Sequence, residues 1–129
     1  MARLIVLDAS VAIAALSAND VHNQAARKAL ASATGDDLVL AATSRIEILV
    51  GPFRVGGGPL AVARDFVDGC ETVPITAAIA DDAAELRARH RALSLPDAIA
   101  LTVAALIDAD AIWTFDRRWN AVDARIVRL

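Results

Sequence analysis

The sequence predicts an α/β fold in which a central, mostly parallel sheet of four to five strands is covered by helices on both faces. Short apolar runs alternate with longer segments of helical periodicity along the whole chain. Apolar residues make up 57% of the chain and aromatic residues only 4%, which favours alanine-rich helices over an all-β sandwich. No repeat or linker divides the 129 residues, so we expect a single domain over residues 1–129.

The first half of the chain is expected to begin with a strand and a helix. Residues 4–7 form a buried apolar strand, and residues 9–16 follow it as an apolar helix. A more polar helix covers about 21–31, and a short strand follows at 38–41. A further helix opens at about residue 45 and ends near residue 50.

The stretch GPFRVGGGPL, residues 51–60, combines two prolines with four glycines. Both residue types interrupt helices, so we expect a flexible connector there. The stretch lacks the Gly-Lys-Ser/Thr ending of a phosphate-binding P-loop. The remaining elements are expected in the order helix, strand, helix, helix, strand and strand, over residues 60–67, 72–75, 77–92, 96–109, 111–115 and 126–129.

The bulk chemistry favours a soluble, cytoplasmic protein. The net charge of −3 gives no support to a strongly basic nucleic-acid surface, although a metal ion can reverse the local charge of an acidic site. The lone cysteine, Cys70, excludes an internal disulfide and fits a reducing compartment. The apolar run at 98–107 is about half as long as a membrane-spanning helix, so we expect no membrane association.

Four acidic residues interrupt or border apolar segments. Asp8 follows the first predicted strand, and Asp116 follows the strand AIWTF. Glu47 and Asp97 lie in the first turns of two predicted helices, among apolar neighbours rather than on solvated faces. Because sites in open parallel sheets form outside the carboxyl ends of the strands, we expect all four side chains to face one cleft.

Helix capping is the structural alternative for each of these acids. Asp8 could cap the first helix, and Asp116 could cap a short helix in RRWNA, residues 117–121. The stretches 44–47 and 94–97 both have the layout of a capping box, in which a serine and an acid three residues later bond each other's backbone. Capping therefore stays open for each acid taken alone.

Taken together, the acids favour a metal site. Converging carboxylates raise one another's pKa values and destabilise the fold unless a cation neutralises them. An all-oxygen donor set, without His or Cys at ligand spacing, favours Mg²⁺ or Mn²⁺ over zinc. Such a centre suits phosphodiester cleavage, because the ion lowers the pKa of a bound water and stabilises the leaving oxygen.

Four stretches, VLDASVAIA, SRIEILVGPFR, LSLPDAIALTVA and AIWTFDRRW, occur in this order along the chain. Together they resemble the PIN-domain family, and more narrowly the VapC-type ribonuclease toxins of type II toxin–antitoxin systems. The resemblance implies a three-layer PIN-like domain and a Mg²⁺- or Mn²⁺-dependent endoribonuclease that cleaves RNA, often a transfer RNA or ribosomal RNA. It also implies a homodimer and a cognate antitoxin protein, whose tail occupies the cleft and often sets a basic side chain against the acids.

Carried over position by position, the resemblance assigns catalysis to the acidic quartet of Asp8, Glu47, Asp97 and Asp116. The metal ligands would be Asp8, Asp97 and Asp116, and Glu47 would complete or orient the cluster. Either one or two ions could bind such a quartet.

Substrate-binding side chains are expected beside the acids. Ser10 and Thr114 match hydroxyl positions seen near the family's site and could bind water, a metal or a phosphate oxygen. Arg45 and Arg117, with neighbouring Arg118, flank two of the acids and are candidate phosphate contacts. Ordinary capping and ion pairing are the alternatives for these side chains.

Several readings stay open. Phe115 stands where many relatives carry a polar residue, and it could stack on a base or face the core. Asp110 is not expected in the site, Trp113 is expected in the core, and Trp119 is expected to be half-exposed. The rival functions are a catalytically inactive PIN-type module that binds RNA or protein, and a metal-dependent DNA nuclease with the same site chemistry.

Overall fold

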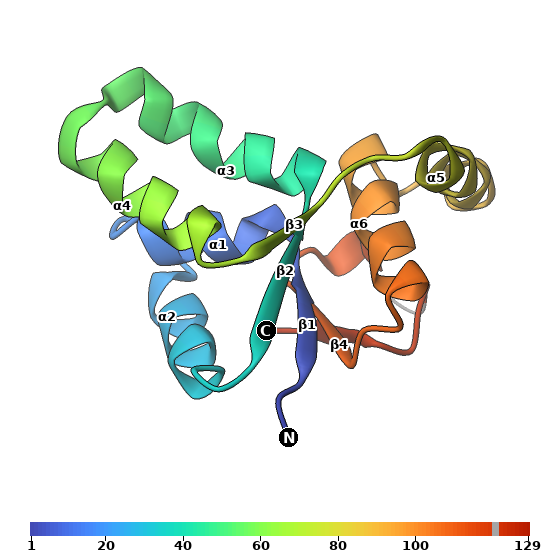
Figure 1. Cartoon of the computed structure of the whole chain (residues 1–129), viewed down its shortest axis with the longest axis horizontal. Helices are drawn as coiled ribbons and strands as arrows, with labels where there is room; N and C mark the ends of the chain where they lie inside the picture. The colour runs from blue at the N-terminus through green and yellow to red at the C-terminus, as the bar shows by residue number, and fades with distance from the viewer. Residues whose placement is uncertain (120–121) are drawn as a thin grey trace.

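The computed structural model describes residues 1–119 and 122–129. Within these residues the chain alternates strands and helices, as expected for an α/β fold (Figure 1). In chain order the elements are β1 (Leu4–Leu7), α1 (Ala9–Leu16), α2 (Asn23–Ser32), β2 (Asp37–Ala41), α3 (Ala42–Val55), α4 (Gly57–Asp68), β3 (Glu71–Val73), α5 (Ala77–Arg89), α6 (Leu95–Leu106), β4 (Ala111–Thr114), the 3₁₀ helix η1 (Arg117–Trp119) and β5 (Ile126–Arg128).

The five strands form one parallel sheet in the order β3-β2-β1-β4-β5. In the central register, Val6 lies opposite Val39 on one side and Ile112 on the other. The chain fills one half of the sheet from β1 to β3 and then returns to fill the other half with β4 and β5. The strand order therefore reverses between β1 and β4, and a crevice at the carboxyl ends of such neighbours is the usual binding site.

Helices cover both faces of the sheet, which confirms the predicted three-layer fold (Figure 1). Side chains alternate along a strand, so Val6 and Leu7 enter different cores. The core around Val6 includes residues of α5 and α6, such as Ile79 and Leu101. The core around Leu7 includes residues of α1 to α4, among them Ile48. Because both cores extend to the strand ends, the loops that follow β1 and β4 are held in place by packing.

The predicted connector at residues 51–60 is wrong. Helix α3 continues through Gly51 and Pro52 to Val55, and only Gly56 separates it from α4. The φ of Gly56 is 76°, in the left-handed region, where a glycine turns the chain without the cost of a Cβ. A proline inside a helix costs about 3 kcal/mol, and here the packing of α3 and α4 against each other overrides that cost.

Helix α3 also begins earlier than predicted, at Ala42 rather than near residue 45. Ser44 therefore lies inside the helix and Glu47 in its second turn, so the capping box predicted for these residues does not form. The N-cap position belongs to Ala41, which has no side-chain oxygen. The remaining predicted element ends match the observed ones or differ from them by up to three residues, as is usual for frayed termini.

Both tryptophans are buried. Trp113 is 5% exposed, which confirms the predicted core position. Trp119 is fully buried, so its predicted half exposure is wrong; its ring belongs to the same buried cluster as Leu101 and Ile112. The short helix η1 is thus anchored in the core by its last residue. None of the described helices is long and apolar enough to cross a membrane.

Candidate acidic active site

Asp8 directly follows β1, at the crevice, and is only 8% exposed. It occupies the N-cap position of α1, yet its side chain accepts no capping hydrogen bond. Its Oδ2 instead accepts hydrogen bonds from the Ser10 hydroxyl at 2.7 Å and the Thr114 hydroxyl at 2.8 Å. Asp8 is therefore a buried carboxylate held by hydroxyl groups, and the capping interpretation fails for it.

The same two hydroxyls fix the loop after β4. The backbone N–H of Phe115 donates to Ser10 Oγ at 3.3 Å, and that of Asp116 donates to Thr114 Oγ1 at 2.9 Å. Each hydroxyl thus donates to Asp8 and accepts from the neighbouring loop. Ser10 and Thr114 were predicted to bind substrate, and in this geometry they position the two acids that border the crevice.

Asp97 lies in the first turn of α6, three residues after the N-cap Ser94. The Ser94 N–H donates to Asp97 Oδ2 at 3.0 Å, and the Asp97 N–H donates to Ser94 Oγ at 3.2 Å. This capping box confirms the structural alternative for Asp97. It occupies one carboxylate oxygen, and no described residue donates a hydrogen bond to Oδ1. A cap and a metal ligand are thus compatible in one side chain that is only 7% exposed.

Asp116 follows β4 and is paired with Arg118. The Arg118 N–H donates to Asp116 Oδ1 at 2.8 Å, which caps η1 as the sequence allowed; residues 120–121 of the predicted short helix lie outside the described residues. The guanidinium of Arg118 also donates to both oxygens of Asp116. These hydrogen bonds hold the pKa of Asp116 below its usual range.

Glu47 reaches the same crevice from the second turn of α3. Partial burial, and then the charges of Asp8 and Asp97, raise its pKa. Burial also raises the pKa of Asp8, opposed by its two hydroxyl donors and reinforced by the charges of Asp97 and Asp116. Asp8 and Glu47 therefore each lie close enough to others of the four acids for those charges to raise their pKa values.

The donor set fits a hard divalent cation, but the ligands are not drawn together. No group of three His, Cys, Asp or Glu side chains among residues 1–119 and 122–129 is placed to hold a metal ion. The chemistry nevertheless suits Mg²⁺ or Mn²⁺, because the crevice offers carboxylate oxygens from Asp8, Asp97 and Asp116. Asp8 Oδ1 accepts no hydrogen bond from the described part of the chain, and Asp116 is bonded to Arg118.

The other residues considered for the site differ in where the structure places them. Arg45 points away from the acids: its guanidinium bonds Asp68 at 2.8 Å and Thr72 Oγ1 at 3.1 Å, which favours the ion-pair alternative. Arg117 is exposed beside Asp116 and keeps its candidate role in phosphate contact. Asp110 bonds the Leu4 N–H at the amino end of the sheet, away from the crevice, as expected.

One feature of the crevice was not predicted from the sequence. The ring of His22, at the N-cap of α2, stacks on Phe115 with ring centroids 4.3 Å apart. Phe115 also packs against the core, which agrees with one of its two predicted positions. The two residues are 93 positions apart in the chain, and no local sequence pattern signals their contact.

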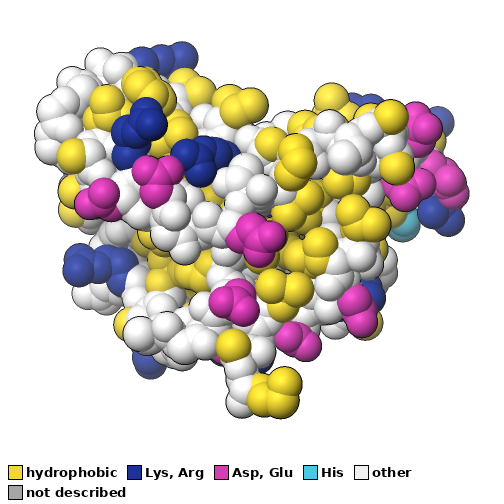
Figure 2. Space-filling model, viewed as in Figure 1, with side chains coloured by type: hydrophobic (Ala, Val, Ile, Leu, Met, Phe, Trp, Pro, Cys, Tyr) yellow, Lys and Arg dark blue, Asp and Glu magenta, His cyan; other side chains and the backbone are white. Residues whose placement is uncertain are grey.

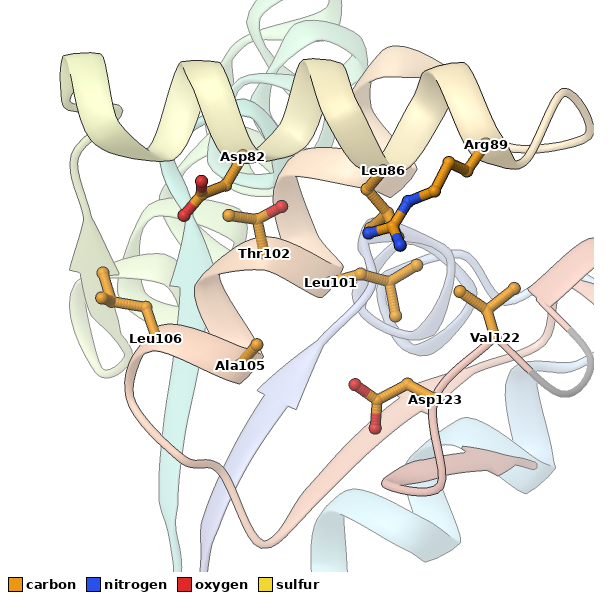
Figure 3. A pocket seen from close by; sticks show the side chains of 9 residues that line it. All are labelled: Asp82, Leu86, Arg89, Leu101, Thr102, Ala105, Leu106, Val122 and Asp123. Carbon is orange, nitrogen blue, oxygen red and sulfur yellow. The ribbon is translucent and has the colours of Figure 1, made fainter.

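A second cavity, of about 350 Å³, lies between α5, α6 and residues 122–123 (Figure 3). Arg89 and Asp82 reach toward it from α5, and Leu101 and Thr102 from α6. The Thr102 hydroxyl already donates to the Ala98 carbonyl of its own helix. None of the acidic quartet lines this cavity, so it is separate from the candidate site.

The fold agrees with comparisons to known proteins. A toxin–antitoxin complex from Klebsiella pneumoniae matches with a TM-score of 0.80 at 21% identity, over 95% of each chain. VapC20 of Mycobacterium tuberculosis, described as a toxin that cleaves the sarcin–ricin loop, matches with a TM-score of 0.80 at 22% identity, over 97% of this chain and 98% of that one. FitAcB from Neisseria gonorrhoeae matches with a TM-score of 0.75 at 18% identity, over 95% of this chain and 96% of that one.

At these identities the structural matches establish a shared fold. A search of curated protein sequences finds no significant match. The model of the PIN domain matches residues 5–125, nearly the whole chain. The chain therefore belongs to the PIN-domain family.

Proposed function

We propose that this protein is a Mg²⁺- or Mn²⁺-dependent endoribonuclease that acts in the cytoplasm as the toxin of a toxin–antitoxin pair. The observation that carries the proposal is that Asp8 and Asp116 follow β1 and β4, where the strand order reverses, and that Arg118 contacts both Asp116 and Asp97. The burial and mutual charge of these acids favour a cation there. The toxins among its structural neighbours, one of them described as cleaving the sarcin–ricin loop, support an RNA target such as transfer or ribosomal RNA.

In this proposal Asp8, Asp97 and Asp116 hold the divalent ion. When bound, the ion supplies an activated water and stabilises the charge of the leaving oxygen. Ser10 and Thr114 keep Asp8 Oδ2 fixed, and Oδ1 accepts no hydrogen bond from the described residues. Glu47, with its raised pKa, accepts a proton at its carboxylate.

An apolar groove beside Glu47 suits a protein partner. It has a volume of about 470 Å³ between α1, α3 and α4, and its lining includes Ile13, Leu16, Pro52 and Val55. We infer that the cognate antitoxin places an apolar segment here and thereby covers the acids. The antitoxin complexes among the structural neighbours support this assignment.

Further apolar side chains lie over the upper end of α3 and α4 (Figure 2). Phe53 is 55% exposed and Val62 is 59% exposed. A second copy of the chain would bury part of this surface, and we propose a homodimer.

The proposal is tested with antitoxin-free protein and two matched substrates, an RNA and a single-stranded DNA of the same sequence, alongside total cellular RNA. We expect discrete RNA fragments in Mg²⁺ or Mn²⁺, none in EDTA, and no DNA cleavage. Equal cleavage of the DNA would identify a general nuclease instead. If folded protein cleaves neither substrate with either metal, the protein is an inactive PIN-type binding module.

A further inference from the structure

We propose that Arg118 is a built-in counter-ion of the acidic site. Its guanidinium takes the place of a cation between Asp97 and Asp116, and it must leave Asp116 before a divalent ion binds there. The inference rests on the proposed metal site, and it adds that the chain carries its own competitor for that site. Metal affinity is then set by an exchange between two cations rather than by the acids alone.

The contacts of Arg118 carry this inference. Its Nε donates to Asp116 Oδ1 at 3.0 Å and to Oδ2 at 3.1 Å, and Nη2 donates to Oδ2 at 2.5 Å. The same Nη2 lies 3.7 Å from Asp97 Oδ2. One guanidinium thus bridges two acids from different parts of the fold, Asp116 in the loop after β4 and Asp97 in α6. An ion pair in which one guanidinium donates hydrogen bonds to both oxygens of a carboxylate is the strong form of an arginine–carboxylate contact.

The backbone around Arg118 makes the exchange reversible. Its neighbour Trp119 is fully buried, and its own N–H donates to Asp116 Oδ1. Both anchors persist when only the side chain moves. The Arg118 side chain is 59% exposed, so it enters solvent without crossing packed atoms. Exposed ion pairs change an equilibrium by up to about fivefold, so a divalent ion can compete with this one.

The expected effect follows from charge. Asp8, Asp97 and Asp116 repel one another when ionised, and Arg118 offsets part of that repulsion without metal. Removing the guanidinium therefore weakens the metal-free fold and frees Asp116 as a ligand. By linkage, whatever stabilises the metal-free state lowers metal affinity by the same factor.

The test is Mn²⁺ binding by calorimetry, without RNA, for wild type, Arg118→Gln and Arg117→Gln. Arg117→Gln removes the same charge from the same short helix but no ion pair formed with a described residue. We expect Arg118→Gln to lower the dissociation constant by about threefold to fivefold, and Arg117→Gln to change it less than twofold. Arg118→Lys, which keeps the charge and loses the fork, should fall between wild type and Arg118→Gln.

Thermal unfolding supplies the second readout. In EDTA we expect a lower melting temperature for Arg118→Gln than for Arg117→Gln, and saturating Mn²⁺ should remove the difference. Unchanged or weaker Mn²⁺ binding by folded Arg118→Gln would overturn the counter-ion role while leaving the metal site intact. If wild type itself binds no Mn²⁺, the proposed metal site fails, and this inference fails with it.

Discussion

Replacing Asp8 with asparagine is expected to lower RNA cleavage by more than about a hundredfold while the domain stays folded. Replacing a side chain that hydrogen-bonds to a metal ligand lowers metal affinity or activity by about 10- to 100-fold. Loss of the ligand itself should lower activity further. The amide oxygen of asparagine can still accept from Ser10 and Thr114, so the local network survives. Cleavage of a labelled RNA in Mn²⁺, with circular dichroism on the same samples, measures both effects.

The same substitution has a predictable effect on stability. Burial raises the pKa of Asp8 in the folded protein above its unfolded value, so the folded state holds this proton more tightly. The stability that Asp8 contributes is fully present below about pH 4 and is lost as the pH rises through the folded pKa. In EDTA at neutral pH, Asp8→Asn should therefore be at least as stable as wild type.

Urea unfolding at pH 5 and pH 8 in EDTA checks this sign. The charges that face Asp8 are those of Glu47, Asp97, Asp116 and Arg118, which the substitution leaves in place. We expect Asp8→Asn to gain most over wild type at the higher pH. A marked loss of stability at both pH values would mean that Asp8 is a structural residue, and undiminished cleavage would remove it from the site.

Replacing Thr114 with valine is the second change with a large expected effect. Its hydroxyl is completely buried, donates to Asp8 and accepts from the Asp116 N–H. Valine keeps the shape but leaves that N–H unpaired, which costs about 1–3 kcal/mol of unfolding free energy. Cleavage should fall by about tenfold to a hundredfold, because both bordering acids lose a positioning contact.

The matched control is Thr102→Val. Thr102 is also buried, but its hydroxyl bonds only the Ala98 carbonyl within α6, away from the acids. This control should retain full cleavage and lose little stability. If Thr114→Val cleaves RNA as fast as Thr102→Val, the hydroxyl network has no part in the reaction.

Much of the fold was accessible from the sequence because a parallel sheet buried on both faces leaves short apolar runs. The strands predicted at 4–7 and 111–115 on that ground are observed at Leu4–Leu7 and Ala111–Thr114. Placement of Asp8 and Asp116 at one edge follows from parallel strands. The prediction failed where tertiary packing decides: α3 runs through Gly51 and Pro52 because α4 packs against it.

The candidate site was only partly accessible. That Asp8 is held by Ser10 and Thr114 depends on the β1–β4 pairing, which no local pattern reports. The side chain of Arg118 closes on Asp116 because buried Trp119 anchors η1, and the sequence predicted that tryptophan to be half-exposed. Positions could be predicted from topology, whereas the choice of side-chain partners required the packed structure.

The central claim, that these acids form a metal-dependent ribonuclease site, is tested most directly at Asp97, where capping and metal binding coincide. Asparagine at position 97 keeps an oxygen that can accept from the Ser94 N–H and removes the charge. The decisive measurement is RNA cleavage in Mn²⁺ by wild type and Asp97→Asn. The melting temperature of each protein is measured alongside, to show that both are folded in the assay. We predict metal-dependent fragments from wild type and none from folded Asp97→Asn. Equal fragments from both proteins would make Asp97 a helix cap alone and contradict the assigned site.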